Sequence, residues 1–226
     1  MFKDKTFLAV IPARGGSKRL PRKNVLDLAG KPLMTWSIDA AKGSKYIDQI
    51  VVTSDDAEIL KIANSLSVDT IKRPADLASD TATTFDAIEH AIKQMSGKYD
   101  FIILLQATSP LRTAAHIDEA IELLAQKNAD AVISVCETDH SPLWSNTLSE
   151  GGSLEGFISE DVKNKRSQDL PKYYRLNGAI YICNTTRLLK EKTFFLSNNI
   201  NAYEMTRSTS IDIDSDMDLH LAKAFI

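Results

Sequence analysis

Residues 7–24 read FLAVIPARGGSKRLPRKN and decide the fold class, because an apolar strand runs directly into a glycine-containing loop. The loop, residues 11–24, holds five cations within ten residues. Its two glycines free the backbone, so N–H groups and cations together can cradle a polyphosphate, whereas in isolation such a loop is also compatible with a solvated turn. The spacing matches neither a Walker loop nor the Gly-x-Gly-x-x-Gly dinucleotide fingerprint. A different nucleotide chemistry is indicated.

An alternation of strands and helices continues outward from this stretch. Apolar, strand-like runs are expected at residues 7–11, 49–53, 68–71, 101–105, 131–135 and 179–183. Helices are expected at residues 33–42, 57–66, 84–95, 115–126 and 216–223. This order predicts an α/β fold of the Rossmann-like type, with a mostly parallel sheet and helices on both faces.

One segment interrupts the alternation. Residues 137–175 are rich in Ser, Asn, Asp, Gly and Lys and contain few apolar runs. We therefore expect a single domain over residues 1–226, with 137–175 as an excursion used for association or substrate recognition.

Composition narrows the classes of partner and compartment. A net charge of −3 with 43% hydrophobic residues is typical of a soluble protein and disfavours an extended nucleic-acid surface. The first apolar run is interrupted too early, by Pro12 and Arg14, for a signal peptide or membrane span. The two cysteines, Cys136 and Cys183, lie in strand-like runs and are expected to be reduced and buried. We expect a cytoplasmic protein without a membrane partner.

Polar segments follow the predicted strands at the edge where ligands of open α/β sheets bind. They are residues 14–16, 53–56 and 106–109. Arg14 and Lys23 are the leading phosphate ligands, because fixed positive charge beside free N–H donors suits a triphosphate.

Two acids near the end of the chain are candidate metal ligands. Asp212 and Asp214 stand two residues apart, so on an extended segment both carboxylates point to one face and can hold Mg²⁺ bound to phosphates. The alternative is that the acids at 214–218 cap the last helix. Capping explains Asp216 and Asp218, but it does not explain an additional acid in the Ile-Asp-Ile run.

Six groups of motifs in order resemble one family, the acylneuraminate cytidylyltransferases or CMP-sialic acid synthetases. They are IPAR at 11–14 with SK at 17–18 and KN at 23–24, RP at 73–74, LASDTA at 77–82, LQATSPLR at 105–112, RLNGAIY at 175–181 and IDID at 211–214. The resemblance spans nearly the whole chain. It implies a homodimeric, Mg²⁺-dependent transferase that joins CMP from CTP to the anomeric hydroxyl of a nine-carbon acidic sugar and releases pyrophosphate.

The resemblance also implies roles for individual residues. Residues expected to bind CTP are Arg14 and Lys23 at the phosphates, and Asn24, Arg73, Ala82 and Thr84 at the cytosine and ribose. Residues expected at the sugar are Gln106, Tyr181, Phe194 and Phe195, with Arg166 and Arg175 as candidates for its carboxylate. Asp212 and Asp214 correspond to the metal ligands, and with Arg14 and Lys23 they form the expected catalytic set.

The excursion departs from the family pattern and leaves the sugar open. Family members often carry a lysine shortly after a His-Pro pair, and here Trp144 stands at that place. N-acetylneuraminic acid and a related nonulosonic acid such as legionaminic acid are both compatible. The eight-carbon keto-deoxy-octulosonate enzymes share the IPAR opening but lack the RLNGAIY segment. A non-catalytic nucleotide-binding module is the alternative from another class, and retention of both Asp212 and Asp214 argues against it.

Overall fold

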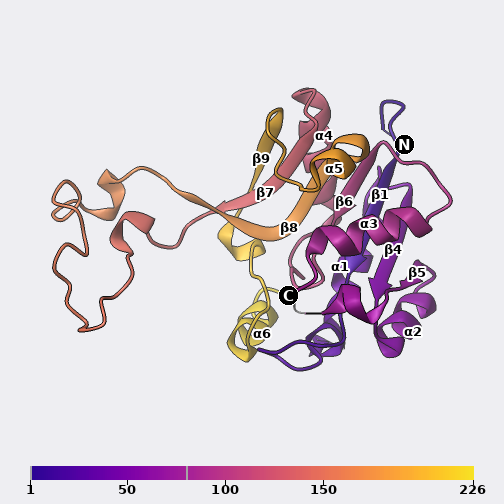
Figure 1. The fold of residues 1–226 in the computed structure, drawn as a ribbon, viewed down its shortest axis with the longest axis horizontal. Helices are drawn as coiled ribbons and strands as arrows, with labels where there is room; N and C mark the ends of the chain where they lie inside the picture. Colours follow the sequence, from indigo (N-terminus) through magenta and orange to yellow (C-terminus); the bar gives the residue numbers. More distant parts are fainter. Residues whose placement is uncertain (1, 80) are drawn as a thin grey trace.

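The first strand, β1 (Phe7–Pro12), is apolar along its length and divides the core into two layers. Phe7, Ala9 and Ile11 pack on one face of the sheet, while Leu8 and Val10 pack on the other. Successive side chains of a strand point to opposite faces, so a strand that is apolar throughout must be covered on both sides. The computed structural model describes residues 2–79 and 81–226 (Figure 1).

The main sheet has seven strands in the order β5-β4-β1-β6-β8-β7-β9. After β1 they are β4 (Gln49–Ser54), β5 (Asp69–Lys72), β6 (Phe101–Leu104), β7 (Ala131–Glu137), β8 (Tyr174–Asn184) and β9 (Ile200–Met205). All pairings are parallel except those of β8, which runs antiparallel to both β6 and β7. A separate two-stranded ribbon joins β2 (Asp27–Leu28) to β3 (Lys31–Pro32).

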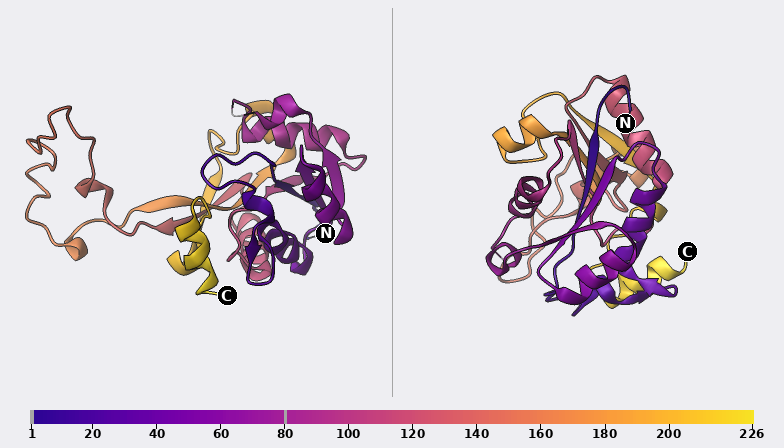
Figure 2. Two further views of the ribbon diagram at one scale, coloured as in Figure 1. Left: turned by 90° about the horizontal axis from the view of Figure 1, so that it is seen from below. Right: turned by 90° about the vertical axis from the view of Figure 1, so that its right-hand side faces the viewer.

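Helices cover both faces of the sheet (Figures 1 and 2). One face packs against α1 (Leu33–Gly43), α2 (Ala57–Ser65) and α4 (Ala114–Gln126), and the other against α3 (Thr84–Gln94) and α5 (Thr185–Glu191). Capping side chains fix where the helices begin: Asp56 accepts N–H bonds at the start of α2, and Thr83 and Thr113 form capping boxes at α3 and α4.

A third, smaller core attaches the end of the chain to the phosphate-loop side of the fold. Leu28 and Leu33 pack there against Ile213 and against the last helix, α6 (Asp216–Lys223). Ile213 also donates its N–H to the carbonyl of Thr108, 2.8 Å away, just beyond β6. These contacts carry the 211–214 motif to the carboxyl edge of the sheet.

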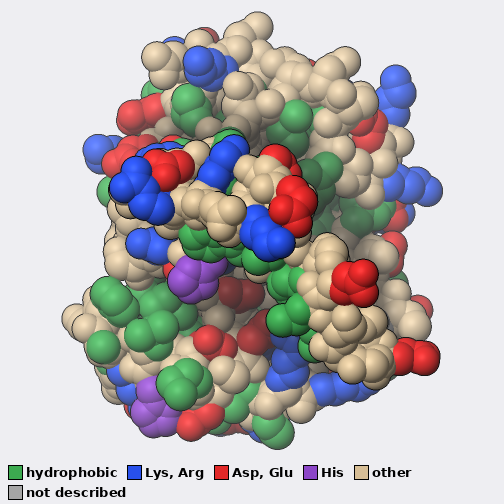
Figure 3. Space-filling view, turned by 90° about the vertical axis from the view of Figure 1, so that its left-hand side faces the viewer, with side chains coloured by type: hydrophobic (Ala, Val, Ile, Leu, Met, Phe, Trp, Pro, Cys, Tyr) green, Lys and Arg blue, Asp and Glu red, His purple; other side chains and the backbone are tan. Residues whose placement is uncertain are grey.

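Beyond the sheet, β7 and β8 lead into a long arm that projects from the body (Figures 1 and 2). The arm, residues 138–173, contains two short 3-10 helices, Pro142–Trp144 and Ser167–Asp169. Most of its side chains are exposed, among them Leu148 and Leu154. Figure 3, which looks along the arm toward the body, shows hydrophobic side chains and charges of both signs sharing this side of the molecule.

The predicted fold class is confirmed, with differences in detail. The structure has a mostly parallel sheet covered by helices, but the predicted 179–183 strand is longer and antiparallel, and β9 and α5 were not predicted. Cys136 and Cys183 are free and buried, as expected. Within residues 2–79 and 81–226, no helix has the length and apolar character needed to cross a membrane.

Candidate active site

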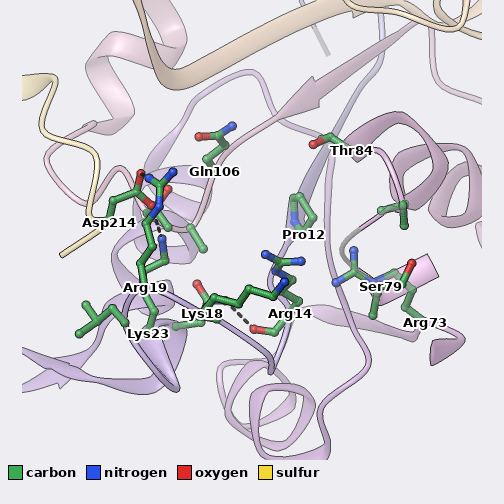
Figure 4. A pocket seen from close by; sticks show the side chains of 18 of the residues that line it. Pro12, Arg14, Lys18, Arg19, Lys23, Arg73, Ser79, Thr84, Gln106 and Asp214 are labelled. Carbon is green, nitrogen blue, oxygen red and sulfur yellow. Dashed lines mark hydrogen bonds and ion pairs between the residues drawn. The ribbon is translucent and has the colours of Figure 1, made fainter. Parts of the chain in front are cut away.

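The loops that follow β1, β5 and β6 surround a cavity of about 590 Å³ (Figure 4). Its size suits a ligand as large as a nucleotide. The residues predicted for the site that line it are Arg14, Lys23, Asn24, Arg73, Ala82, Thr84, Gln106, Asp212 and Asp214. The structure thus gathers segments that are far apart in the chain at the edge where the sequence places the site.

The basic loop is anchored to the start of α2. The N–H of Gly15 donates to Asp55 Oδ1 at 3.1 Å, and a Cβ on Gly15 would lie 2.7 Å from Asp56 Oδ2, so only glycine fits there. Arg22, in the left-handed region with φ of 58°, forms ion pairs with both Asp56 and Glu58. Its hydrogen bond is the main reason that the pKa of Asp56 lies below the ordinary value.

Asp214 is surrounded by cations from the loop. Lys23 Nζ donates to Asp214 Oδ1 at 2.8 Å and to the carbonyl of Ile213 at 2.7 Å, and Arg19 Nη1 donates to Asp214 Oδ2 at 2.8 Å. The hydrogen bond from Lys23 is the largest influence that holds the pKa of Asp214 below its usual range. Figure 4 shows the Lys23, Arg19 and Asp214 side chains meeting at one end of the cavity.

Asp212 has a different environment. Burial raises the pKa of its carboxyl above the ordinary value. A hydrogen bond with Thr108 lowers this pKa in part, and the nearby charge of Asp214 raises it further. Its Oδ1 atom is buried and has no hydrogen-bond partner in the described structure. Residues 211–214 belong to no strand of the sheet, and both carboxylates line the same cavity. The third core and the Ile213–Thr108 bond hold this segment at the cavity.

The pair fits a divalent cation that is also held by phosphate. An orphaned buried carboxylate oxygen on Asp212 suits a hard cation, since Mg²⁺ takes one or two protein carboxylates and completes its shell with water and phosphate. Across residues 2–79 and 81–226, no cluster of three or more His, Cys, Asp or Glu side chains is arranged for a metal. The side chain of Asp214 does not cap the last helix, because Ser215 and Asp218 form the capping box of α6. Only the backbone N–H of Asp214 takes part, and it donates to Asp218 Oδ2 at 3.1 Å.

The opposite end of the cavity presents buried donors. Arg73 is 6% exposed, and its Nε and Nη2 atoms have no hydrogen-bond partner among the described residues. Burial lowers the pKa of Arg73, an effect that Asp55, 3.9 Å away, partly offsets. Asn24 donates from Nδ2 to the carbonyl of Arg14 at 2.9 Å, which leaves its buried Oδ1 without a partner. Such a set of fixed, unpaired polar atoms suits a hydrogen-bonding base and ribose.

Gln106 lies between these two ends of the cavity (Figure 4). The expected acyl-group wall forms one aromatic cluster outside the cavity lining: Tyr181 meets Phe194 and Phe195 edge to face, with ring centroids 5.9 and 6.4 Å apart. Tyr181 is buried and its pKa is raised, first by burial and then by the charge of Asp212.

The two arginines predicted for the sugar carboxylate do not line this cavity. Arg166 lies in the projecting arm, where it forms an ion pair with Asp169. Arg175 lies where the arm rejoins β8, and its Nη2 donates to the carbonyl of Ser210 at 3.3 Å. Within one chain, the arm that carries Arg166 projects away from the body of the molecule (Figure 1).

Several lining residues were missed by the role assignment. Lys18, Arg19 and Ser79 line the cavity, and Thr108 hydrogen-bonds Asp212. Lys18 and Arg19 belong to the basic loop that the sequence predicts as a phosphate cradle. A linear sequence does not reveal which of its five cations face the cavity. Asp80, inside the 77–82 motif, is outside the described residues.

Comparisons with known proteins identify the family of the chain. Residues 8–224 match the family model described as cytidylyltransferase. The chain is 39% identical over 210 residues to an N-acylneuraminate cytidylyltransferase of Streptococcus agalactiae, covering 92% of this chain and 50% of that protein. It thus spans about half the length of such curated relatives.

Two further relatives are matched over nearly their full length. A pseudaminic acid cytidylyltransferase of Campylobacter jejuni is 34% identical, with 96% of this chain and 94% of that protein covered. A CMP-N,N'-diacetyllegionaminic acid synthase of Legionella pneumophila is 36% identical, with the same coverage of 96% and 94%. Among solved structures, a CMP:2-keto-3-deoxy-manno-octonic acid synthetase complexed with CTP superposes with a TM-score of 0.71 at 17% identity, covering 97% of both chains, which supports the fold.

Proposed function

This chain belongs to the cytidylyltransferase family, and from that premise we propose that it transfers CMP from CTP to the anomeric hydroxyl of a nine-carbon acidic sugar, releasing pyrophosphate. The single observation that carries the proposal is the cavity in which the basic loop faces Asp212 and Asp214. Relatives whose printed names include N-acylneuraminate, pseudaminic acid and diacetyllegionaminic acid support a nonulosonic acid as the acceptor.

In this reaction the anomeric hydroxyl of the acid gives up its proton to solvent and its oxygen attacks the α-phosphorus of CTP. The bond from that phosphorus to the pyrophosphate oxygen breaks. Arg14 and Lys23 bind the triphosphate and neutralise charge that develops on the departing pyrophosphate. Arg73, Asn24, Ala82 and Thr84 hold the cytosine and ribose. This arrangement accelerates the step chiefly by orienting the two substrates.

Mg²⁺ held by Asp212 and Asp214 is part of the proposal, and it would supply further neutralisation of phosphate charge. The orphaned Oδ1 of Asp212 supports that assignment. Two side chains of the protein, Lys23 and Arg19, bind Asp214 and hold it in place before substrates arrive.

The sugar is proposed to lie beside Gln106, with its acyl groups toward Tyr181, Phe194 and Phe195 and its carboxylate near Arg175. These assignments rest on the family resemblance together with the position of Gln106 in the cavity and of Tyr181 near Asp212.

The direct test is pyrophosphate release from CTP and Mg²⁺ with a panel of acids: N-acetylneuraminic, legionaminic, pseudaminic and keto-deoxy-octulosonic. We expect turnover with a nine-carbon acid and none when a chelator removes the metal. Turnover confined to the eight-carbon acid would overturn the assignment of the acceptor. Tight CTP binding with no turnover on any acid would favour the non-catalytic module.

We further propose that the chain forms a single domain whose excursion, residues 137–175, mediates a homodimer. Support comes from the arm's exposed Leu148 and Leu154 and from Arg166, which lies on the projecting arm and does not line the cavity of its own chain. A second copy of the chain would bring Arg166 to a cavity.

Mixed subunits test this arrangement. Arg166→Ala and Asp214→Asn are each expected to be inactive, and after co-expression the heterodimer should regain activity, because one of its sites receives an intact Arg166 and an intact Asp214. If the mixture stays as inactive as its components, Arg166 does not act across the dimer.

We also propose a cytoplasmic location, where CTP is available and buried thiols such as Cys136 and Cys183 stay reduced.

A further inference from the structure

One cation in the fold is fully buried and belongs to no part of the triphosphate site. Arg112, in the turn between β6 and α4, is 1% exposed and is among the largest fully buried side chains. Within residues 2–79 and 81–226, no carboxylate forms an ion pair with it. Burying a charge without a counter-charge opposes folding, so the guanidinium must be held by other polar groups.

The partners of Arg112 are neutral oxygens from three elements. Nε donates to the carbonyl of Ala179 on β8 at 3.0 Å, and Nη2 donates to the carbonyl of Gln106 at 3.0 Å and to Ser37 Oγ on α1 at 2.7 Å. Ser37 Oγ in turn donates to the same Gln106 carbonyl at 3.0 Å. The planar fork of a guanidinium fixes several directions at once, which a lysine ammonium on a flexible stem does not.

These bonds hold the two backbone segments that frame the Gln106 side chain. Gln106 Oε1 lies against the backbone of Gly178, where a Cβ would come within 2.4 Å of it. Gly178 directly precedes Ala179, whose carbonyl Arg112 binds. Arg112 therefore fixes both the residue that carries the Gln106 amide and the strand surface against which that amide rests.

We infer that Arg112 is a positioning residue for the acceptor half of the site: it sets the distance between Gln106 and β8, and so the direction in which the Gln106 amide faces the sugar. It contacts neither substrate. The inference rests on the proposed function, because the sugar is assigned to Gln106 there. The triphosphate groups lie on other segments, so their binding should not depend on Arg112.

The test compares Arg112→Lys with Arg187→Lys. Arg187 is also held by several partners, since it binds Asp130, Glu191 and Asn198, but it does not line the cavity. For Arg112→Lys we expect kcat/KM for the acid to fall about 10- to 100-fold, because displacing a substrate by up to about an ångström costs that much in rate. The Kd of CTP should stay within about twofold. Arg187→Lys should lower the melting temperature and leave both constants unchanged.

Equal losses of CTP affinity and acid turnover in Arg112→Lys would overturn the inference, as would kinetics like those of the wild type. If Arg112→Lys does not fold, Ser37→Ala removes one Arg112 partner without touching the charge. In that variant the side-chain amide resonance of Gln106 should shift in the ¹⁵N spectrum, whereas an unmoved resonance contradicts the positioning role. The spectrum needs no turnover, so an inactive wild type would refute the proposed function separately.

Discussion

At the scale of single residues, Asp212 and Asp214 differ in burial and in their ion pairs. Asp214 is 45% exposed and pairs with Lys23 and Arg19, while Asp212 is more deeply buried and keeps an unpaired oxygen. The sequence predicted this pair but not the difference in environment. That difference arises from packing of Ile213 in the third core, which a two-residue spacing does not encode.

Asp214→Asn should separate stability from turnover. Its ion pairs are partly exposed, so their loss should cost at most about 1 kcal/mol of the free energy of unfolding. Turnover should fall about 100-fold or more, because a metal ligand and a charge anchor are lost together. Asp216→Asn, in the first turn of α6, is the control and should retain turnover. Thermal unfolding measures the change in stability, and pyrophosphate release measures the change in turnover. A comparable loss of activity in both variants would show that Asp214 has only a structural role.

Asp56→Asn should destabilise the protein in a pH-dependent way. Asparagine keeps the cap of α2 but loses the charge that pairs with Arg22. The pKa of Asp56 is lowered from 3.8 in the folded state, so its stabilisation is present above that value and is lost as pH falls through the lower folded value.

Urea unfolding at a series of pH values checks this sign. The difference from the wild type should be about 1 kcal/mol near neutral pH and shrink toward zero in acid. A difference that persists unchanged in strong acid would mean that the Arg22 pair does not stabilise the fold.

At the scale of elements, the sequence predicted the strand and helix positions better than their pairing. Helices with clear caps, such as those after Asp56, Thr83 and Thr113, begin as expected. An apolar run does not reveal the direction of a strand, so the sequence pattern did not predict that β8 runs antiparallel to its neighbours. β9 was missed because its side chains are half exposed and polar residues interrupt it. The caps are local signals, whereas pairing depends on contacts distant in sequence.

Gly178→Ala tests how tightly β8 approaches Gln106. Gly178 has φ of 76°, and a Cβ there would meet Gln106 Oε1 at 2.4 Å. Gly152 has φ of 69° with open space around it, so Gly152→Ala carries the backbone strain without the collision. Both variants should lose about 1 kcal/mol or more of stability, and only Gly178→Ala should also lose turnover with the acid. Equal kinetics in the two variants would show that the close approach has no part in the site.

The two cysteines should be unreactive in the folded strands. Burial raises the pKa of the Cys183 thiol to about 12, and Cys136 is also buried. A thiol-specific reagent should label neither at neutral pH and both after denaturation. Rapid labelling of the native protein would place a thiol at the surface.

At the scale of the whole molecule, the ordered motifs predicted the family. Five of the six motif groups contribute residues to the cavity lining, and the sixth, RLNGAIY, lies on β8. The sequence predicted the arm as an irregular excursion used for association or substrate recognition. Its reach follows from how β7 and β8 extend beyond the sheet (Figure 1). What the arm contacts depends on a second chain, which a single sequence does not describe. The proposed roles of the separate segments meet in one reaction at the cavity.

The most direct measurement of that reaction uses an acid labelled with ¹⁸O at its anomeric hydroxyl, incubated with the protein, CTP and Mg²⁺, and followed by ³¹P NMR. If the anomeric oxygen attacks the α-phosphorus, the label must appear in the new phosphodiester, with an isotope shift of its resonance, and the pyrophosphate must be unlabelled. A CMP-acid product without label would contradict the proposed attack, and absence of any phosphodiester with every nonulosonic acid would contradict the account as a whole.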